Sequence, residues 1–328
     1  MSKEKKLETW LAALYPQQIA SIHFAAQDAD ARQYYRLRLK NGQSYIVMQA
    51  QAERIIPYIK VQNIFQAVHV PTIYHVNQQE GLMVLQDFGD NTFIHLMQCN
   101  PEPSFHQNLL LKGIDTLIQL QSSSQEGRLP PYQNAVLEEE MDLFVNWCLP
   151  YYFKCSSLSL AEQQIWRSVK GLIIQQIAQT SQVYVHRDYI VRNLMLLHDN
   201  NVGVIDFQDA LWGSICYDLV SLTKDAFFSW DESLILDVVI RYWQKAKQAG
   251  LPVDHSFDDF YRHYEWMGIQ RHLKVAGIFA RLKVRDNKIL YFDEIPRFID
   301  YLKKTCQRYS KLHGLYQLLL TLEKSDGH

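Results

Sequence analysis

Apolar and polar side chains alternate along the first part of the chain. Within Tyr34–Lys40, one face carries a tyrosine and two leucines, and the opposite face is mostly basic. Asn41-Gly42 follows, and a second apolar segment runs from Ser44 to Ala50. Because alternation on both sides of Asn-Gly is a strong hairpin signal, the pattern predicts a β-hairpin over Tyr34–Ala50.

Further short elements are expected around this hairpin. Apolar segments predict strands over Ile19–Ala25, Ile73–Val76 and Leu82–Gln86. Helical periodicity predicts helices over Lys5–Leu14 and Glu53–Val68, and the polar segment Gln27–Gln33 predicts a turn. Residues 1–86 are therefore expected to form a small, mainly antiparallel-sheet lobe.

The pattern changes after Asp90, where apolar residues recur with a helical period. The segments that carry this periodicity are Phe105–Gln121, Leu137–Cys148, Leu160–Thr180, Ser214–Ser229, Ser233–Ala249, Phe257–Lys283, Pro296–Lys311 and Leu315–Lys324. We therefore expect residues 87–328 to form a large, mainly helical lobe, and the whole chain to have an α+β fold of two lobes.

Three polar residues stand out in a β-like stretch of the helical part. Short buried strands are predicted over Val183–Val185, Leu194–Leu197 and Val202–Ile205. Asp188, Asn193 and Asp206 fall on the turns between these strands or just after them. We expect the turns to meet at one end of a small sheet, which would bring two carboxylates and an amide within reach of one point. Oxygen ligands of this kind suit a hard cation such as Mg²⁺.

The spacing of these residues is similar to a known catalytic loop. His186-Arg187-Asp188 followed by Asn193 resembles the H-R-D-x-x-x-x-N loop of protein-kinase-like phosphotransferases. Asp206 in Ile-Asp-Phe stands where the metal-binding Asp of D-F-G would stand. The alternative is that these side chains only cap turns. Both motifs together, with strands on either side, favour a protein-kinase-like two-lobe fold.

Composition describes the setting of this chemistry. The 328 residues carry a formal net charge of −2, which gives no indication of a nucleic-acid partner. The five cysteines are scattered without a C-x-x-C pair, which favours a reducing cytosol over a zinc site or a disulfide framework. We find neither a signal-peptide pattern nor an apolar segment long enough to span a bilayer. We expect a cytoplasmic monomer or weak dimer that acts on a small molecule, with no membrane or nucleic-acid partner.

With these motifs, the chain resembles the aminoglycoside-phosphotransferase-like kinase family. Within that family it is similar to the anomeric kinases of N-acetylmuramate and N-acetylglucosamine, and the resemblance covers nearly the whole chain. The most specific segments are His186–Tyr189, Asn193–Met195, Val204–Ala210, Tyr217–Leu222, Met267–Val275 and Gly277–Leu282. The last two segments distinguish the anomeric kinases from aminoglycoside-resistance enzymes.

The resemblance implies roles for the residues that match its motifs. Asp188 would accept or orient the proton of the attacking hydroxyl. Asn193 and Asp206 would hold Mg²⁺. His186 and Asp218 would support the catalytic loop rather than take part in the chemistry.

The nucleotide site is expected at a hinge. Leu85–Asp90 resembles the family's hinge, so the backbone around Gln86, Asp87 and Phe88 would take the adenine edge of ATP. Met48 lies on the strand where most kinases carry a phosphate-binding Lys, and no Gly-rich loop is present. The candidates to supply the missing positive charge are Arg32, Arg36 and Lys60, for each of which a solvated surface role is the alternative.

Five residues are candidates to contact the acceptor: Asp209, Glu139, Asp142, Arg271 and His272. A cation in the middle of the long helix would suit the carboxylate of a sugar acid. The alternatives are a turn carboxylate for Asp209, solvated helix charges for the two residues near position 140, and packing against the catalytic loop for the helix pair.

The sequence thus predicts an ATP- and Mg²⁺-dependent kinase that phosphorylates a hydroxyl of a small molecule. The preferred acceptor is the anomeric hydroxyl of N-acetylmuramate or N-acetylglucosamine, as in the recycling of cell-wall sugars. Within the same class, an aminoglycoside or a choline-type compound is the alternative acceptor. Ile190, where the family usually has a second His, and Met48 leave open a nucleotide-binding protein without turnover. A metal-dependent hydrolase is a third possibility.

Overall fold

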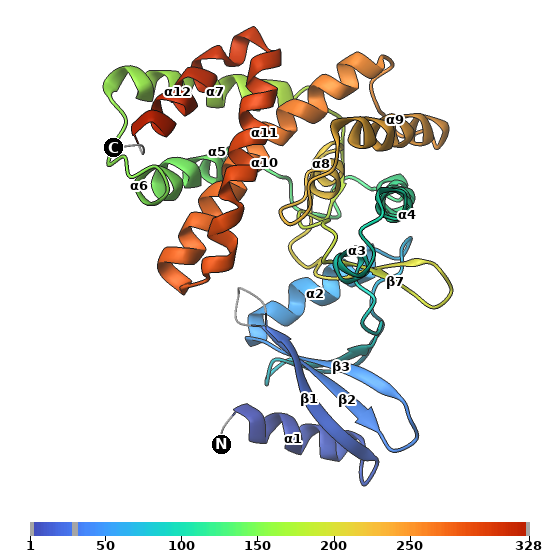
Figure 1. The fold of residues 1–328 in the computed structure, drawn as a ribbon. Helices are drawn as coiled ribbons and strands as arrows, with labels where there is room; N and C mark the ends of the chain where they lie inside the picture. The colour runs from blue at the N-terminus through green and yellow to red at the C-terminus, as the bar shows by residue number, and fades with distance from the viewer. Residues whose placement is uncertain (1–2, 28–31, 326–328) are drawn as a thin grey trace. The chain divides into compact units, whose positions relative to one another are not determined.

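The structure, a computed structural model, describes residues 3–27 and 32–325 of the chain. Residues 28–31 of the predicted polar turn lie outside the described residues. The chain forms two compact units: residues 1–101 with 191–210, and residues 102–190 with 211–328 (Figure 1). The predicted lobe boundary between residues 86 and 87 stays a prediction.

The first unit is built on a five-stranded antiparallel sheet in the order β1-β2-β3-β5-β4. Its strands are β1 (Ile19–Gln27), β2 (Gln33–Leu39), β3 (Ser44–Gln49), β4 (Ile73–Asn77) and β5 (Leu82–Gln86). Pairing of Arg38 with Ser44 closes the hairpin that the alternation predicts. Gly42 in its turn has φ of +89°, a left-handed conformation that glycine adopts without steric cost.

Helix α1 (Lys3–Leu14) packs on this sheet and forms the core of the unit with it (Figure 1). Leu7 and Leu11 of the helix are buried against sheet residues that include Leu37, Val47 and Val84. Burying one such side chain stabilises the fold by about 1.5–3 kcal/mol. The first unit also contains α2 (Ala52–Ile64), which ends four residues before the predicted helix end, and α3 (Phe93–Cys99), which the pattern did not predict.

A small hairpin from much later in the chain completes the first unit. It consists of β7 (Leu194–Leu196) and β8 (Val202–Val204), and Val204 N donates to the carbonyl of His69 over 2.8 Å. The third short strand, β6 (Gln182–Val185), pairs instead with β9 (Leu211–Ser214) in the second unit. The expectation of one small sheet was therefore wrong: the segments form two separate two-stranded sheets.

The second unit is helical apart from β6 and β9. Its helices are α4 (Pro103–Ser122), α5 (Asn134–Leu143), α6 (Leu149–Tyr151), α7 (Leu160–Ile177), α8 (Tyr217–Thr223), α9 (Glu232–Gln248), α10 (Phe257–Asp286), α11 (Ile295–Arg308) and α12 (His313–Ser325). A π-helical turn η1 (Phe144–Cys148) and 3-10 turns η2 (Ile289–Glu294) and η3 (Ser310–Leu312) join them. The helix predicted over Ser214–Ser229 is shorter because the Asp225 carboxylate accepts the backbone N–H of Phe227 over 2.8 Å, which favours a turn.

Helix α10 is the centre of the second unit, where it contacts α5, α7, α8 and α11. Its middle, from His263 to Lys274, is buried on every face, as expected for a helix inside a large core. Several of these buried residues are polar. Because a buried polar group without a hydrogen bond is costly, each of them needs a partner or a ligand.

Gly277 lets α10 approach the end of α5 closely. A Cβ at this position would lie 2.3 Å from the backbone carbon of Leu143 and 2.5 Å from its oxygen. Backbone atoms cannot move aside as a flexible side chain does, so we expect Gly277→Ala to lower the free energy of unfolding by about 1–3 kcal/mol. Urea unfolding followed by circular dichroism measures the change.

Gly171 in α7 is the matched control, because a Cβ there would meet no atom within 4 Å. Gly171→Ala should raise the free energy of unfolding by about 0.5–1 kcal/mol, since alanine favours a helix more than glycine does. Equal stability of Gly277→Ala and the wild type would contradict the close approach of the two helices.

Candidate active site

The β7–β8 hairpin places Asn193 and Asp206 next to each other in the first unit. Just beyond the pairing of Leu194 with Val204, the backbone N–H of Ile205 donates to the carbonyl of Asn193 over 3.1 Å. Asp206 follows with φ of +65°, a left-handed conformation that costs on the order of 1–3 kcal/mol outside glycine. A strained backbone directly after a buried strand aims the carboxylate, and both side chains line one cavity.

This cavity has a volume of about 330 Å³ and lies within the first unit. Small-molecule sites span about 300–1,000 Å³, so the cavity is large enough for part of a nucleotide. Its apolar walls include Ile46, Leu85, Met195 and Ile205. Asn193 and Asp206 are among its polar lining residues. The arrangement suits a flat base against the apolar walls and charged groups near the carboxylate.

Two of the predicted hinge residues have side chains that fix the cavity wall. The Gln86 side chain accepts the Thr72 backbone N–H over 3.3 Å and its hydroxyl over 3.1 Å. The Phe88 ring covers Gly203, where a Cβ would come within 2.7 Å of the ring. Both residues line the cavity. Their side chains are used for these wall contacts, whereas the predicted contact with adenine would be made by their backbone atoms.

Asp87, the third hinge residue, is held by its own surroundings. Arg36 Nε lies 2.8 Å from one carboxylate oxygen, Ser44 donates to the same oxygen, and the backbone N–H of Gly89 donates to the other over 2.9 Å. Burial raises the pKa of Asp87, but these hydrogen bonds and Arg36 together hold it below its usual value. Arg36 also pairs with Asp90 over 2.7 Å, so its positive charge is paired with two carboxylates of the hinge.

Arg32 is the predicted cation that reaches the metal motif. Its Nη2 lies 2.9 Å from Asp206 Oδ1, and its side chain is only 6% exposed. Met48, where most kinases carry a Lys, is completely buried. Lys60 lies exposed on α2. Because Arg36 is paired with Asp87 and Asp90, Arg32 is better placed than Lys60 among the three predicted cations.

Asn193 and Asp206 fit a magnesium ion by the chemistry of their donors. They offer one amide and one carboxylate to the cavity, and Mg²⁺ in kinases takes one or two carboxylates together with waters and phosphates. Gln208 Nε2 donates to Asp206 Oδ1 over 3.0 Å and helps to orient it. Within residues 3–27 and 32–325, no three His, Cys, Asp or Glu side chains form a site that could hold a metal alone. A magnesium ion held by Asn193 and Asp206 would take its remaining ligands from phosphates and water.

In the second unit, Asp218 at the start of α8 organises the segment before Asp188. Its buried carboxylate accepts the backbone N–H of His186 over 2.6 Å and that of Arg187 over 3.1 Å. Burial raises the pKa of Asp218 to about 7, although both backbone donors act in the opposite direction. Arg187 has φ of +75°, so this motif residue is also held in a left-handed conformation.

His186 supports the same turn from inside. It is completely buried, its ring packs edge-on to Tyr189, and its Nδ1 accepts the backbone N–H of Asp188 over 3.3 Å. Asp188 itself is exposed. His186 and Asp218 thus both bind the backbone of the turn on which Asp188 is exposed.

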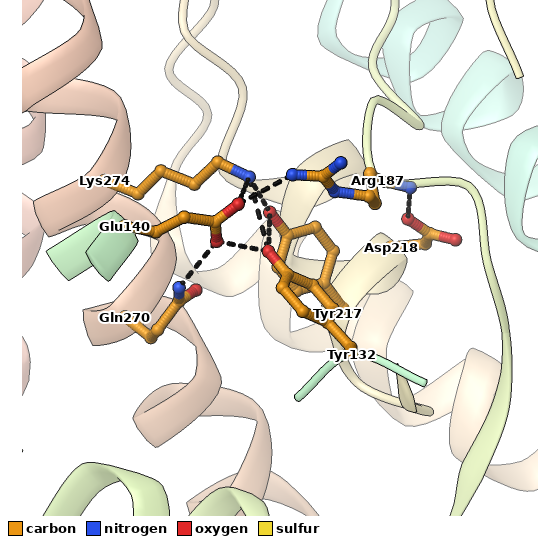
Figure 2. A network of polar contacts seen from close by, with 7 residues as sticks. All are labelled: Tyr132, Glu140, Arg187, Tyr217, Asp218, Gln270 and Lys274. Atoms are coloured by element: carbon orange, nitrogen blue, oxygen red, sulfur yellow. Dashed lines mark hydrogen bonds and ion pairs between the residues drawn. The ribbon is translucent and has the colours of Figure 1, made fainter. Parts of the chain in front are cut away.

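A network of buried polar side chains adjoins this turn (Figure 2). Glu140 of α5 lies at its centre: one carboxylate oxygen is 2.8 Å from Lys274 Nζ and 2.7 Å from Arg187 Nη2. The other oxygen accepts Gln270 Nε2 over 3.1 Å and the hydroxyl of Tyr132. Lys274 also donates to the hydroxyl of Tyr217 over 2.9 Å, so each formal charge in the network has partners.

The network holds two cations and one carboxylate close to Asp188. Burial raises the pKa of Glu140, but Lys274, Tyr132 and Arg187 together hold it below its usual value. Burial lowers the pKa of Lys274 and of Arg187, but their anionic and phenolic neighbours raise both overall, and Asp188 is among the contributors. The network by itself carries one net positive charge, and the carboxylate of the adjacent Asp188 balances it.

Glu140 was not predicted, whereas its neighbours Glu139 and Asp142 were. Glu139 is exposed, and Asp142 binds Trp166 Nε1 over 2.8 Å and Lys170 Nζ over 2.7 Å, neither of which belongs to the network. The signal was present in the spacing: Glu140 falls three residues after buried Leu137, on the apolar face of α5. An acidic residue on such a face requires charged partners. The network residues that were not predicted as site residues are Tyr132, Glu140, Arg187, Tyr217, Gln270 and Lys274.

The other acceptor candidates lie in different surroundings. Asp209 is half-buried in the first unit, 3.8 Å from Arg54, a cation that was not predicted. Arg271 and His272 are buried in α10 of the second unit. Nε and Nη1 of Arg271 have no hydrogen-bond partner in the described part of the chain. His272 packs against Tyr301 of α11 with ring centroids 5.1 Å apart, a contact with another helix rather than with the catalytic loop named as its alternative.

Residues 21–253 match the model of the phosphotransferase enzyme family. The chain belongs to this family. It is 46% identical to the N-acetylmuramate/N-acetylglucosamine kinase of Neisseria meningitidis serogroup B, over 98% of this chain and 96% of that protein. A protein of the same name from Pseudomonas aeruginosa is 37% identical, over 97% of this chain and 96% of that protein. The predicted family and the prediction of a phosphotransferase are confirmed.

Solved structures support the fold class. The choline kinase LicA from Streptococcus pneumoniae gives a TM-score of 0.65 at 12% identity, covering 91% of this chain and 98% of that chain. An ADP-bound aminoglycoside phosphotransferase gives 0.57 at 11% identity, covering 90% and 97%. At such identities the likeness concerns the fold alone, and it confirms the predicted protein-kinase-like α+β class. Among the helices of the described residues, none has the length and apolar character required to cross a bilayer.

Proposed function

We propose that this protein is an ATP- and Mg²⁺-dependent kinase that phosphorylates the anomeric hydroxyl of N-acetylmuramate or N-acetylglucosamine in the cytoplasm. The similarity at 46% identity to a kinase of that name, over nearly the full length of both chains, carries this proposal. The motif residues Asp188, Asn193 and Asp206 are all present. Their surroundings within each unit support the following roles in catalysis.

In this mechanism Asp188 accepts or orients the proton of the anomeric hydroxyl as that oxygen attacks the γ-phosphate. The supports from His186 and Asp218 hold its turn in place. Asn193 and Asp206 would hold Mg²⁺, which neutralises and orients phosphate charge when it is bound. Phosphoryl transfer depends on positioning and charge rather than on covalent catalysis. The contribution required of the chain is therefore to hold Asp188, Asn193 and Asp206 in fixed positions.

Arg271 is our candidate for the carboxylate of N-acetylmuramate, a group that N-acetylglucosamine lacks. Its side chain is buried, and two guanidinium nitrogens have no hydrogen-bond partner among the described residues. A guanidinium binds a carboxylate through two parallel hydrogen bonds. The nucleotide is proposed to lie against the hinge backbone of Gln86–Phe88, with Arg32 near its phosphates.

A panel of acceptors tests the proposal. We expect purified protein with Mg²⁺ and ATP to release ADP with either amino sugar at least about a hundredfold faster than with choline or an aminoglycoside. Phosphorus NMR should identify a sugar 1-phosphate. Release of phosphate without any acceptor would indicate a hydrolase, and ATP binding without ADP release a protein without turnover. Absence of ADP release above the no-acceptor control across the amino sugars would contradict the proposal.

A further inference from the structure

Lys224 is a buried cation outside the network of Figure 2. It follows the last residue of α8, and its backbone N–H donates to the carbonyl of Val220. Its Nζ lies 5.2 Å from the ring centre of Tyr264 and 5.8 Å from that of Tyr301. No residue of the described chain accepts a hydrogen bond from its ammonium or forms an ion pair with it. A cation over two aromatic faces is stabilised, but its hydrogen-bonding capacity stays unused.

The side chain of Lys224 lines a small cavity of about 70 Å³ in the second unit. That volume holds more than one water molecule and is far below that of a sugar or nucleotide site. The ionisable side chains around it are Lys224, Lys304, Arg308, Glu232 and two tyrosines, Tyr261 and Tyr301. Cations therefore outnumber carboxylates in the lining.

The nearby carboxylates are already engaged. Arg308 donates to both Glu232 and Glu265, and Glu265 also accepts the hydroxyl of Tyr309 over 2.7 Å. Neither carboxylate lies within ion-pair distance of Lys224 in the described structure. Burial lowers the pKa of Lys224 to about 8, and Arg308 and Lys304 act in the same direction while the two carboxylates oppose them. The ammonium of Lys224 is therefore not paired with a carboxylate of the described chain.

Gly268 and His272 of α10 lie beside Lys224. A Cβ on Gly268 would lie 3.8 Å from Lys224 Nζ and 3.5 Å from His272 Cε1, so the ammonium lies against α10. His272 is completely buried, and burial, Lys224 and Arg271 all lower its pKa, so the ring is neutral. A neutral ring and an aromatic face leave the ammonium directed toward the cavity.

We propose that the cavity around Lys224 binds a small oxyanion, either phosphate or a short carboxylate, held by Lys224 and Lys304. Lysine acts as a point charge toward phosphate, and a hydrogen bond between two charged groups is stronger than one between neutral groups. This site is independent of the proposed kinase activity. It lies at the end of α8 opposite Asp218, so a bound anion contacts the helix that supports the catalytic turn.

Equilibrium dialysis with radiolabelled inorganic phosphate, at constant ionic strength set by sodium chloride, tests the site. We expect one phosphate per chain, and we expect Lys224→Met to weaken its binding at least about tenfold. Lys304→Met should weaken it less, because Lys304 is exposed, and this second variant serves if Lys224→Met does not fold. Acetate as a competitor distinguishes the two anions. If acetate displaces the labelled phosphate at concentrations similar to those of phosphate, the site accepts carboxylates; if it does not, the site is specific for phosphate.

Lys303→Met is the matched control. Lys303 lies next to Lys304 on α11 but pairs with Glu323 over 2.7 Å. The variant should therefore bind phosphate within about twofold of the wild type. Two outcomes overturn the proposal: no phosphate binding up to about 10 mM, or binding that is the same in the wild type and both Lys224→Met and Lys304→Met. Equal binding in all variants would place the anion elsewhere, and Lys224 would be a structural lysine only.

Discussion

Asp188→Asn is expected to lower kcat by about 10²–10⁴-fold, the usual contribution of a positioned general base. Asparagine has nearly the same shape as aspartate but cannot accept the proton of the attacking hydroxyl. The backbone N–H of residue 188 would still donate to His186 Nδ1, and Asp218 would still hold the preceding turn. The variant should therefore fold normally and bind ATP with an unchanged dissociation constant.

The measurement is kcat and KM from coupled ADP release, with ATP binding followed separately by calorimetry. Asp237→Asn is the control, because Asp237 is a half-exposed residue of α9 that pairs with Arg241 at 2.7 Å and accepts a hydrogen bond from Gln107. Exposed pairs contribute little, so the control should keep kcat within about twofold. A kcat of Asp188→Asn equal to that of the wild type would remove Asp188 from the role of base.

Much of the fold could be predicted because its signals are local. The Asn-Gly turn with alternation on both sides specifies the β2–β3 hairpin, and the helical period locates most helices of the second unit to within a few residues. Strand β9 could not be predicted in this way: Leu211–Ser214 is short, and it becomes a strand only through pairing with β6. For the same reason, one expected sheet proved to be two.

The candidate site shows the same division between local and distant information. Asp188, Asn193 and Asp206 could be chosen because a fixed spacing of residues identifies them. Glu140 and Lys274 lie 134 positions apart, and no spacing joins them; only the packing of α5 on α10 brings them to 2.8 Å. The position of Glu140 on the apolar face of α5 could have identified it in place of exposed Glu139. The partners of Glu140 could not be inferred without the fold.

Glu140→Gln is expected to lower the free energy of unfolding by about 3 kcal/mol at neutral pH. Glutamine keeps the size of the side chain but removes the charge that Lys274 and Arg187 share. Removing one partner of a buried ion pair costs about 3–5 kcal/mol, because the remaining charge stays buried. We expect the lower end of this range, since the Arg187 side chain is 24% exposed and water can reach it.

The pH dependence of this difference identifies its electrostatic origin. The folded protein holds the pKa of Glu140 below the ordinary value of 4.5, so the carboxylate stabilises the fold fully above that pH. This contribution decreases as the pH falls through the lowered pKa, where the protonated glutamate resembles glutamine. We therefore expect the difference in free energy of unfolding between variant and wild type, measured by urea unfolding, to be smaller near pH 4 than at neutral pH.

Two further proteins separate charge from packing in the same experiment. Glu139→Gln changes the same residue type at the adjacent exposed position and should stay within about 0.5 kcal/mol of the wild type. The double variant Glu140→Gln with Lys274→Met removes one of the two buried cations, so it should lose less stability than the sum of the single changes. Strict additivity would mean that Glu140 and Lys274 do not stabilise each other. Since Arg187 directly precedes Asp188, a loss of kcat in Glu140→Gln under conditions where the variant remains folded would show that the network also positions the catalytic turn.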